Sequence, residues 1–190
     1  MAMALVVMVG LVVAIVVIVG LAAMAIYNGL VGQRNRVQNA WAQIDVQLKR
    51  RHDLIPNLVN SVKGFMAHER EILERVTQAR ASAIAAGNNV AARADAENAL
   101  TGAMRSLFAV AEAYPALRSN ENMLALQEEL SSTENRIAFS RQHYNDAVME
   151  YNTGQQTFPA VLFAASLGFR PADLFAVDDA AERAVPTVSF

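Results

Sequence analysis

The stretch LKRRHDLIPNLV, residues 48–59, decides how many helices the chain forms. It places three consecutive basic residues, a histidine and an aspartate ahead of an apolar run that Pro56 interrupts. Asp53 stands where a helix N-cap supplies an oxygen, and Pro56 then falls in the first turn, where its missing N–H costs little. Basic side chains in a last turn suit the negative end of a helix dipole. We therefore predict a tight corner, with one helix ending near Arg51 and another beginning at Asp53.

An apolar region without any charged side chain, residues 1–33, precedes this corner. About 20 predominantly apolar residues, at 1.5 Å each in a helix, cross the hydrocarbon core of a bilayer. A cleaved secretory signal is the alternative, because AMA at residues 23–25 resembles a cleavage site. The run has no positive n-region and is longer than a usual h-region. We therefore predict a retained transmembrane anchor over residues 1–27.

The distribution of charge predicts an orientation and excludes several function classes. Positive residues follow the anchor and none precedes it, which favours an outward N-terminus and a cytoplasmic body. The formal net charge of -2 is not that of a nucleic-acid-binding protein. Because the chain has no cysteine, it has no disulfide framework, thiolate metal site or cysteine nucleophile.

Beyond the anchor, apolar residues recur at helical spacing, and β-type alternation is absent. Such seams predict four long amphipathic helices. The seam positions are Val37, Trp41, Ile44 and Leu48; then Ile55, Val59, Val62, Met66, Leu73 and Val76; then Leu100, Met104, Leu107, Ala111 and Tyr114; and finally Leu126, Leu130, Thr133, Ile137, Ser140, Tyr144, Ala147 and Tyr151.

Turn and cap residues divide these seams. Residues 87–89, Gly-Asn-Asn, predict a turn, Pro115 predicts the end of the third helix, and Gly154 predicts the end of the fourth. Ser119 or Asn120 can cap the fourth helix. Short connections force antiparallel neighbours. The predicted fold class is all-α, with a single N-terminal transmembrane helix followed by an antiparallel four-helix bundle.

A tail, residues 155–190, follows the predicted bundle, residues 28–154. We expect a short helix from Pro159 to Leu167 and then an extended end. The tail carries more apolar side chains than a loose segment leaves in water. They either fold back onto the bundle or dock on a neighbouring copy or partner, and the short connection favours folding back. The apolar residues are Val161, Leu162, Phe163, Leu167 and Phe169.

Three long segments resemble the LemA family of small bacterial membrane-anchored helical proteins. They are QNAWAQIDVQLKRRHDLIPNLVNSVKGFMAHE (38–69), AEAYPALRSNENMLALQEELSSTENRIAFSRQHYN (111–145) and YNTGQQTFP (151–159). The resemblance implies a four-helix bundle behind one span of the bacterial inner membrane, with the N-terminus outside and the bundle in the cytoplasm. It also implies no established catalytic activity, and an association of some members with membrane proteases or membrane-remodelling systems. Met123 departs from the pattern, because members often carry an aromatic residue there.

No motif predicts an enzyme, a cofactor or a metal. The three histidines, at positions 52, 68 and 143, lack the partners of a zinc or di-iron site, and a surface or capping role is expected for each. There is no Gly-x-Ser-x-Gly elbow and no phosphate-binding glycine loop. The acids of the fourth helix are interpreted as a solvated face, because Glu128 and Glu129 are adjacent and point in different directions. These acids are Glu121, Glu128, Glu129 and Glu134.

The remaining prominent residues are candidates for structure or interaction, and none is assigned a ligand. The repeated Tyr-Asn pairs, 144–145 and 151–152, lie one heptad apart, where a polar residue can hydrogen-bond across helices and fix register. The candidates are Trp41, Arg50, Arg51, Asp53, Pro56, Tyr114, Pro115, Asn135, Tyr144, Asn145, Tyr151 and Asn152.

We therefore expect a membrane-anchored, non-enzymatic bundle that acts as a cytoplasmic protein-interaction platform. Its expected partners are the lipid bilayer and an unidentified membrane or cytoplasmic protein, with no nucleic acid; the resemblance suggests a membrane protease system. The alternative is a homo-oligomeric scaffold that organises or remodels the bilayer. Gly10 and Ala14, four residues apart, favour association of helices in the membrane and support that alternative.

Overall fold

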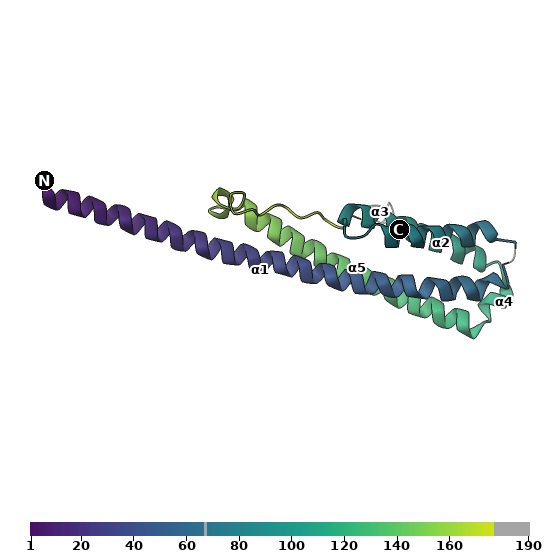
Figure 1. The fold of residues 1–190 in the computed structure, drawn as a ribbon. Coiled ribbons are helices and arrows are strands. Elements are labelled where there is room, and N and C mark those ends of the chain that lie inside the picture. The colour runs from purple at the N-terminus through teal and green to yellow at the C-terminus, as the bar shows by residue number, and fades with distance from the viewer. Residues whose placement is uncertain (67, 177–190) are drawn as a thin grey trace, which may run out of the picture. The chain divides into compact units, whose positions relative to one another are not determined.

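A computed structural model describes residues 1–66 and 68–176, and this part of the chain is helical without a strand (Figure 1). The all-α prediction is confirmed. The helices are α1 (Ala2–Lys63), α2 (Arg70–Ala85), α3 (Val90–Ala111), α4 (Pro115–Arg118), α5 (Glu121–Gln156) and a 3-10 helix, η1 (Ala160–Leu162).

The chain packs as two compact units, which are described separately. The anchor unit comprises Met1–Trp41 and Asn145–Ala172, and the core unit comprises Ala42–Tyr144 and the described residues from Asp173 onward. Helices α1 and α5 each contribute residues to both units.

The predicted corner at residues 48–59 is wrong, because α1 continues through it to Lys63. Pro56 lies inside α1 and cannot donate to the carbonyl of His52, one turn earlier. The guanidinium of Arg80, on α2, takes the place of that donor: its Nε lies 2.6 Å from the His52 carbonyl oxygen. The His52 carbonyl, which the proline would leave unpaired, therefore accepts a hydrogen bond from a neighbouring helix. This lets α1 continue past Pro56.

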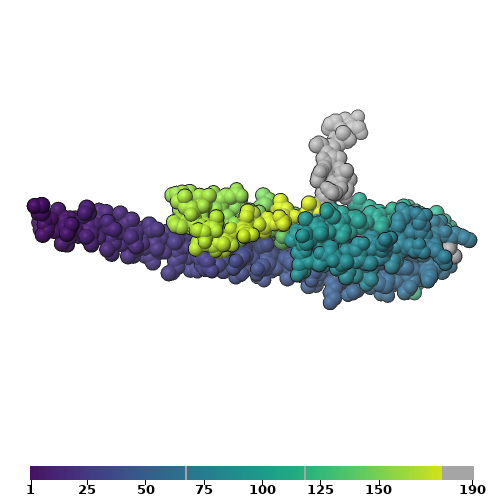
Figure 2. Space-filling view, turned by 45° about the horizontal axis from the view of Figure 1, so that its top comes forward, coloured from purple at the N-terminus to yellow at the C-terminus, as the bar shows by residue number. Residues whose placement is uncertain are grey.

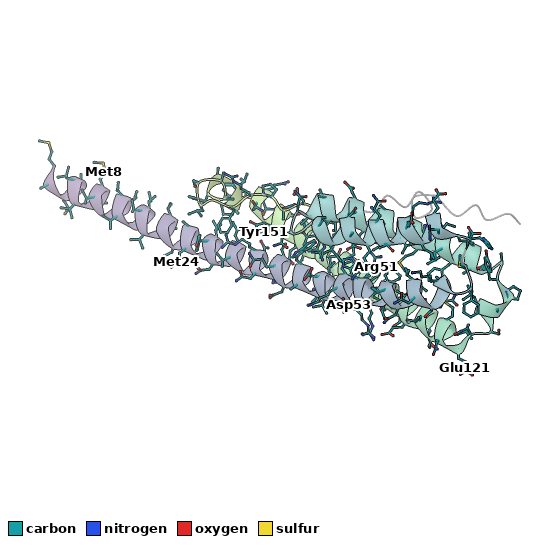
Figure 3. All side chains as sticks on the ribbon, turned by 45° about the vertical axis from the view of Figure 1, so that its right-hand side comes forward. Met8, Met24, Arg51, Asp53, Glu121 and Tyr151 are labelled. Atoms are coloured by element: carbon teal, nitrogen blue, oxygen red, sulfur yellow. The ribbon has the colours of Figure 1, made fainter. Side chains whose placement is uncertain are left out.

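Asp53 is consequently not a helix cap. It lies on the exposed side of α1, far from either end of the helix, whereas Arg51 faces the interior of the core unit (Figure 3). The turn after α1 comes later, beyond Lys63, where Phe65 and Met66 both donate backbone hydrogen bonds to the Val62 carbonyl, at 3.0 and 2.9 Å.

The other predicted boundaries agree more closely with the structure. The turn at 87–89 is confirmed: Gly87 has φ +61°, and Asn89 caps α3 by accepting from the Ala92 N–H at 2.9 Å. The third helix ends at Ala111, ahead of Pro115, which opens α4.

Of the two candidate caps for α5, Asn120 performs the task, since its Oδ1 accepts from the Met123 N–H at 3.2 Å. The helix ends at Gln156, two residues beyond the predicted Gly154. The short helix expected over 159–167 is reduced to η1 followed by turns that end at Gly168, where φ is +81°.

The core unit has one apolar centre to which all five α-helices contribute. The seam predicted for the third helix is buried at Leu100, Met104, Leu107 and Ala111, while Tyr114 is half-buried. The buried residues of this core are Ile55, Leu58, Val62, Met66, Leu73, Val76, Ala83, Leu100, Met104, Leu107, Ala111, Leu117, Met123 and Leu130.

In the anchor unit, the apolar part of α1 is long and apolar enough to cross a membrane. Its most apolar 18-residue window has a mean hydropathy of 3.3, and none of that window is buried. Met8 and Met24, labelled in Figure 3, both project from the surface of this part of the helix.

Arg80 supplies the hydrogen bond to the His52 carbonyl that Pro56 cannot make, and a double-mutant cycle tests this compensation. Arg80→Met should lower the unfolding free energy by about 1–3 kcal/mol, because the His52 carbonyl loses its partner. The same change should cost less in a Pro56→Ala background, where the alanine N–H can reach that carbonyl. Chemical denaturation of the detergent-solubilised chain, followed by circular dichroism, measures both.

Arg75→Met is the matched control on the same helix. Arg75 makes an exposed i,i+4 pair with Glu71 at 3.5 Å, so its loss should cost well under about 1 kcal/mol. Equal costs of Arg80→Met in the two backgrounds would contradict the proposed compensation.

Candidate functional site

Four ionisable side chains from three helices meet inside the core unit, and we call them the Arg51 cluster. Arg51 and His52 come from α1, Glu97 from α3 and Glu134 from α5. The guanidinium of Arg51 pairs with the carboxylate of Glu97, and its Nη1 lies 2.9 Å from Oε1 of Glu134. Nε2 of His52 lies 2.9 Å from the other carboxylate oxygen of Glu97.

The cluster is buried to an unusual degree for charged groups. Arg51 is 2% exposed, Glu97 3% and His52 5%, whereas the Glu134 side chain is 36% exposed. Thr101 completes the arrangement, because its hydroxyl accepts from Arg51 at 3.1 Å and donates to the Glu97 carbonyl at 3.0 Å. Buried ions are tolerated in proteins when they are paired in this way.

The cluster changes the proton affinity of its members. Burial by itself would raise the pKa of Glu97, but the contact from His52 and the charge of Arg51 outweigh it, so the pKa lies below its ordinary value. For Arg51, burial would lower the pKa, but the charges of Glu134 and Glu97 raise it instead. Arg51 is therefore a permanent cation and Glu97 a carboxylate at neutral pH.

A pocket of about 510 Å³ lies beside the cluster and gives it an opening to solvent. The candidate residue Asn135 lines it together with Arg105 and Arg141. The carboxylates of the cluster already bind its own cations, and the described residues contain no group of three His, Asp or Glu side chains placed to hold a metal ion. The arrangement therefore joins α1, α3 and α5 and offers no nucleophile with an adjacent free base.

The remaining candidates on the core unit have structural partners. Arg50 pairs with Glu129 at 2.8 Å, with both side chains about half exposed. The hydroxyl of Tyr114, the residue before α4, donates at 3.2 Å to Glu69, the residue before α2. Pro115, in the first turn of α4, needs no N–H there.

One residue of each Tyr-Asn pair binds the tail. In the core unit, the Tyr144 hydroxyl donates to the Asp173 carbonyl at 2.8 Å. In the anchor unit, Asn152 donates to the Ala172 carbonyl and accepts from its N–H, both at 2.9 Å. The bonds of Asn152 thus go to the tail backbone and not across helices as expected. Tyr151 is buried, and the other two candidates, Trp41 and Asn145, are half-buried.

Sequence reasoning missed the Arg51 cluster, although a signal for it exists. Arg51 lies three residues after Leu48 and four before Ile55, in the apolar seam of α1. Glu97 likewise lies three residues before Leu100 in the seam of α3. A charged residue in a seam position predicts a buried ion pair, and the expectation that His52 is a surface or capping residue was wrong for the same reason.

A second feature of the core unit is a groove between the end of α1 and α2, which we call the α1–α2 groove. Its volume is about 690 Å³. Buried or half-buried apolar residues form its floor, and exposed polar and charged residues form its rim. The lining residues are Val59, Asn60, Lys63, Met66, Arg70, Leu73, Glu74, Thr77, Gln78 and Ala81.

Breaking the Arg51 cluster should destabilise the protein. Glu97→Gln should lower the unfolding free energy by about 3 kcal/mol, because it leaves the buried guanidinium short of a counter-charge. Since the pKa of Glu97 is lowered in the folded chain, its stabilising effect is present above its ordinary pKa of 4.5 and lost as pH falls below it. The difference in unfolding free energy between the unsubstituted chain and the Glu97→Gln variant should therefore be largest at pH 7 and should shrink below about pH 4.5.

Denaturation curves of the solubilised chain at several pH values measure this difference. Glu129→Gln is the matched control, because it removes the exposed partner of Arg50 and should cost below about 1 kcal/mol at every pH. A Glu97→Gln protein as stable as the control would show that the cluster contributes nothing net.

The chain is similar in sequence to several known proteins. Residues 40–190 match the LemA family. The chain is 25% identical to the protein LemA of Metamycoplasma hominis, over 69% of this chain and 60% of that protein. It is 25% identical to a magnetosome protein MamQ of Paramagnetospirillum magneticum and 24% to MamQ of Magnetospirillum gryphiswaldense, each over 78% of this chain and 64% of the relative. The chain thus spans less than two thirds of these relatives. It belongs to the LemA family.

Proposed function

We propose that the protein is a non-catalytic, membrane-anchored platform whose helical bundle docks a partner protein. In this proposal the bundle is a four-helix antiparallel one that lies on the cytoplasmic side of a bacterial inner membrane. The partner contributes an amphipathic helix, and the α1–α2 groove receives it.

The α1–α2 groove carries the proposal. Its floor includes Val59 from α1, Leu73 from α2 and Met66 from the turn between them, a surface suited to apolar anchors at helical spacing. Its rim offers both signs of charge, with Lys63 and Arg70 beside Glu74. A helix with one apolar face and mixed charges along its edges matches this lining in shape and polarity.

The Arg51 cluster supports the non-catalytic part of the proposal. Groups with strongly perturbed proton affinity often mark active sites. Here the buried members bind one another across three helices, which is the pattern of a structural ion-pair network. A stable bundle with such a network presents a fixed surface for binding.

The runner-up function is a self-assembling membrane scaffold. Gly10 and Ala14 lie on the uncovered part of α1, and a Cβ at Gly10 would meet nothing within 4 Å, so a second apolar helix can approach closely there. The MamQ relatives are named as magnetosome proteins, and that name suits a role in organising membrane-associated assemblies. In this reading the partner of the chain is another copy of itself.

Site-specific photocrosslinking in intact membranes distinguishes the two functions. A photoreactive residue at Gln78, in the groove, should yield a discrete adduct with a different protein. Ala81→Arg should reduce that adduct about tenfold, since a charged side chain then occupies the apolar groove. Immunoblotting and mass spectrometry of the adduct provide the measurement.

Asn57 is the matched control position, because it is exposed on α1 and does not line the groove. It should yield no adduct of that size. An adduct between two copies of this chain at Gln78 would contradict the platform and support the scaffold.

The orientation is tested by proteolysis of intact spheroplasts. Because positive charge lies only on the C-terminal side of the apolar run, the chain beyond Trp41 should resist protease added from outside. It should become sensitive once the membrane is permeabilised. Digestion of the bundle before permeabilisation would overturn the cytoplasmic assignment.

A further inference from the structure

The tail returns to α1 at the place where the apolar run ends. Within the anchor unit, the ring of Phe169 packs edge-to-face against Tyr27, with centroids 5.6 Å apart. The guanidinium carbon of Arg34 lies 5.5 Å from the centre of the same ring. Tyr27 and Arg34 are about 10 Å apart along the helix, and Arg34 is the first charged residue after the uncharged stretch. Phe169 therefore contacts α1 where its uncharged part ends.

Further contacts fix the tail at this level of the anchor unit. Asn152 binds both backbone groups of Ala172, as described above. Gly154 lies so close to Gln33 that a Cβ at this position would clash with the glutamine side chain. Figure 2 shows the segment, coloured yellow-green, against α1 where the uncovered purple part of the helix ends. The tail is therefore attached beside the membrane exit of α1.

The turn that leads into this attachment, residues 157–168, exposes apolar side chains. Phe158 is 81% exposed, Leu162 65% and Val161 49%. From Tyr151 to Phe169 the chain carries no charged residue and no histidine. A patch of this kind on a water-facing surface would be unfavourable, because each exposed apolar side chain gains about 1.5–3 kcal/mol on burial.

We propose that residues 157–168 insert into the interfacial layer of the same bilayer that the apolar part of α1 crosses. The buried ring of Phe169, at the end of this turn, packs on Tyr27 and so joins the patch to α1 where its apolar part ends. Tyr27 is 43% exposed and is of the residue type that lines the boundary between lipid tails and water. Arg34 and Arg170 are exposed and lie just beyond the uncharged stretches, where phosphate headgroups attract cations.

The proposed contact gives the protein two attachments to one leaflet. The span of α1 supplies the first, and the turn of residues 157–168 supplies a shallow second one at the C-terminal end of that span. The proposal rests on the membrane span of α1 and is independent of any partner in the α1–α2 groove.

Depth-dependent fluorescence quenching tests the proposal on the full chain in phosphatidylcholine–phosphatidylglycerol vesicles. Because the chain has no cysteine, Leu162→Cys can be labelled alone with an environment-sensitive fluorophore. Its emission should be blue-shifted, and lipids with a nitroxide near the headgroup should quench it at least about twofold more than they quench the control. Circular dichroism checks that each variant keeps its helical content.

Met149→Cys is the matched control, since Met149 is 59% exposed on α5, in the same unit and outside the turn. Val13→Cys reports on the span itself and should be quenched by nitroxides deep in the acyl chains. Equal quenching of the labels at 162 and 149 would overturn the proposal, and so would a Val13 label that lipid nitroxides fail to quench. A blue-shifted label at 162 that lipid nitroxides do not reach would also overturn it, because protein would then cover the patch.

Discussion

The charge of Arg51 is the constraint on which the core unit depends. Removing a guanidinium from water costs several kcal/mol, and only well-placed counter-charges offset that cost. Glu97 and Glu134 can supply them only when α3 and α5 stand in one register against α1. Apolar side chains tolerate small shifts along a helix, whereas a buried ion pair does not. The cluster therefore selects one packing among those that the apolar seams alone would permit.

The helical content and most element boundaries were predictable from the sequence, because they depend on local chemistry. The spacing of Leu100, Met104 and Leu107 is visible without knowledge of any other helix, and so is the turn at Gly87. The prediction of a corner at Pro56 was wrong, because an aspartate followed by a proline in the first turn satisfies every local rule for a helix start. The donor that keeps α1 intact is Arg80, 28 residues away from His52, and no local rule identifies it.

The candidate residues show the same division between local and distant information. Tyr144 and Asn152 were noticed for their repeat, yet the carbonyls they bind belong to Asp173 and Ala172, in a tail whose path could not be read from periodicity. Arg51 was noticed for its charge and assigned to a solvated helix end. Its position in the apolar seam predicts burial, but that prediction can be made only if α1 is already known to continue past Pro56.

The sequence separation within the Arg51 cluster has a consequence for synthesis of the chain. Arg51 precedes Glu97 by 46 residues and Glu134 by 83. At about 5–20 residues per second, a ribosome makes Glu134 roughly 4–17 s after Arg51. During that interval this cation, which is buried in the folded chain, has no complete set of counter-ions. This side chain must stay hydrated until α5 has been made, so closure of the cluster is a late step in folding.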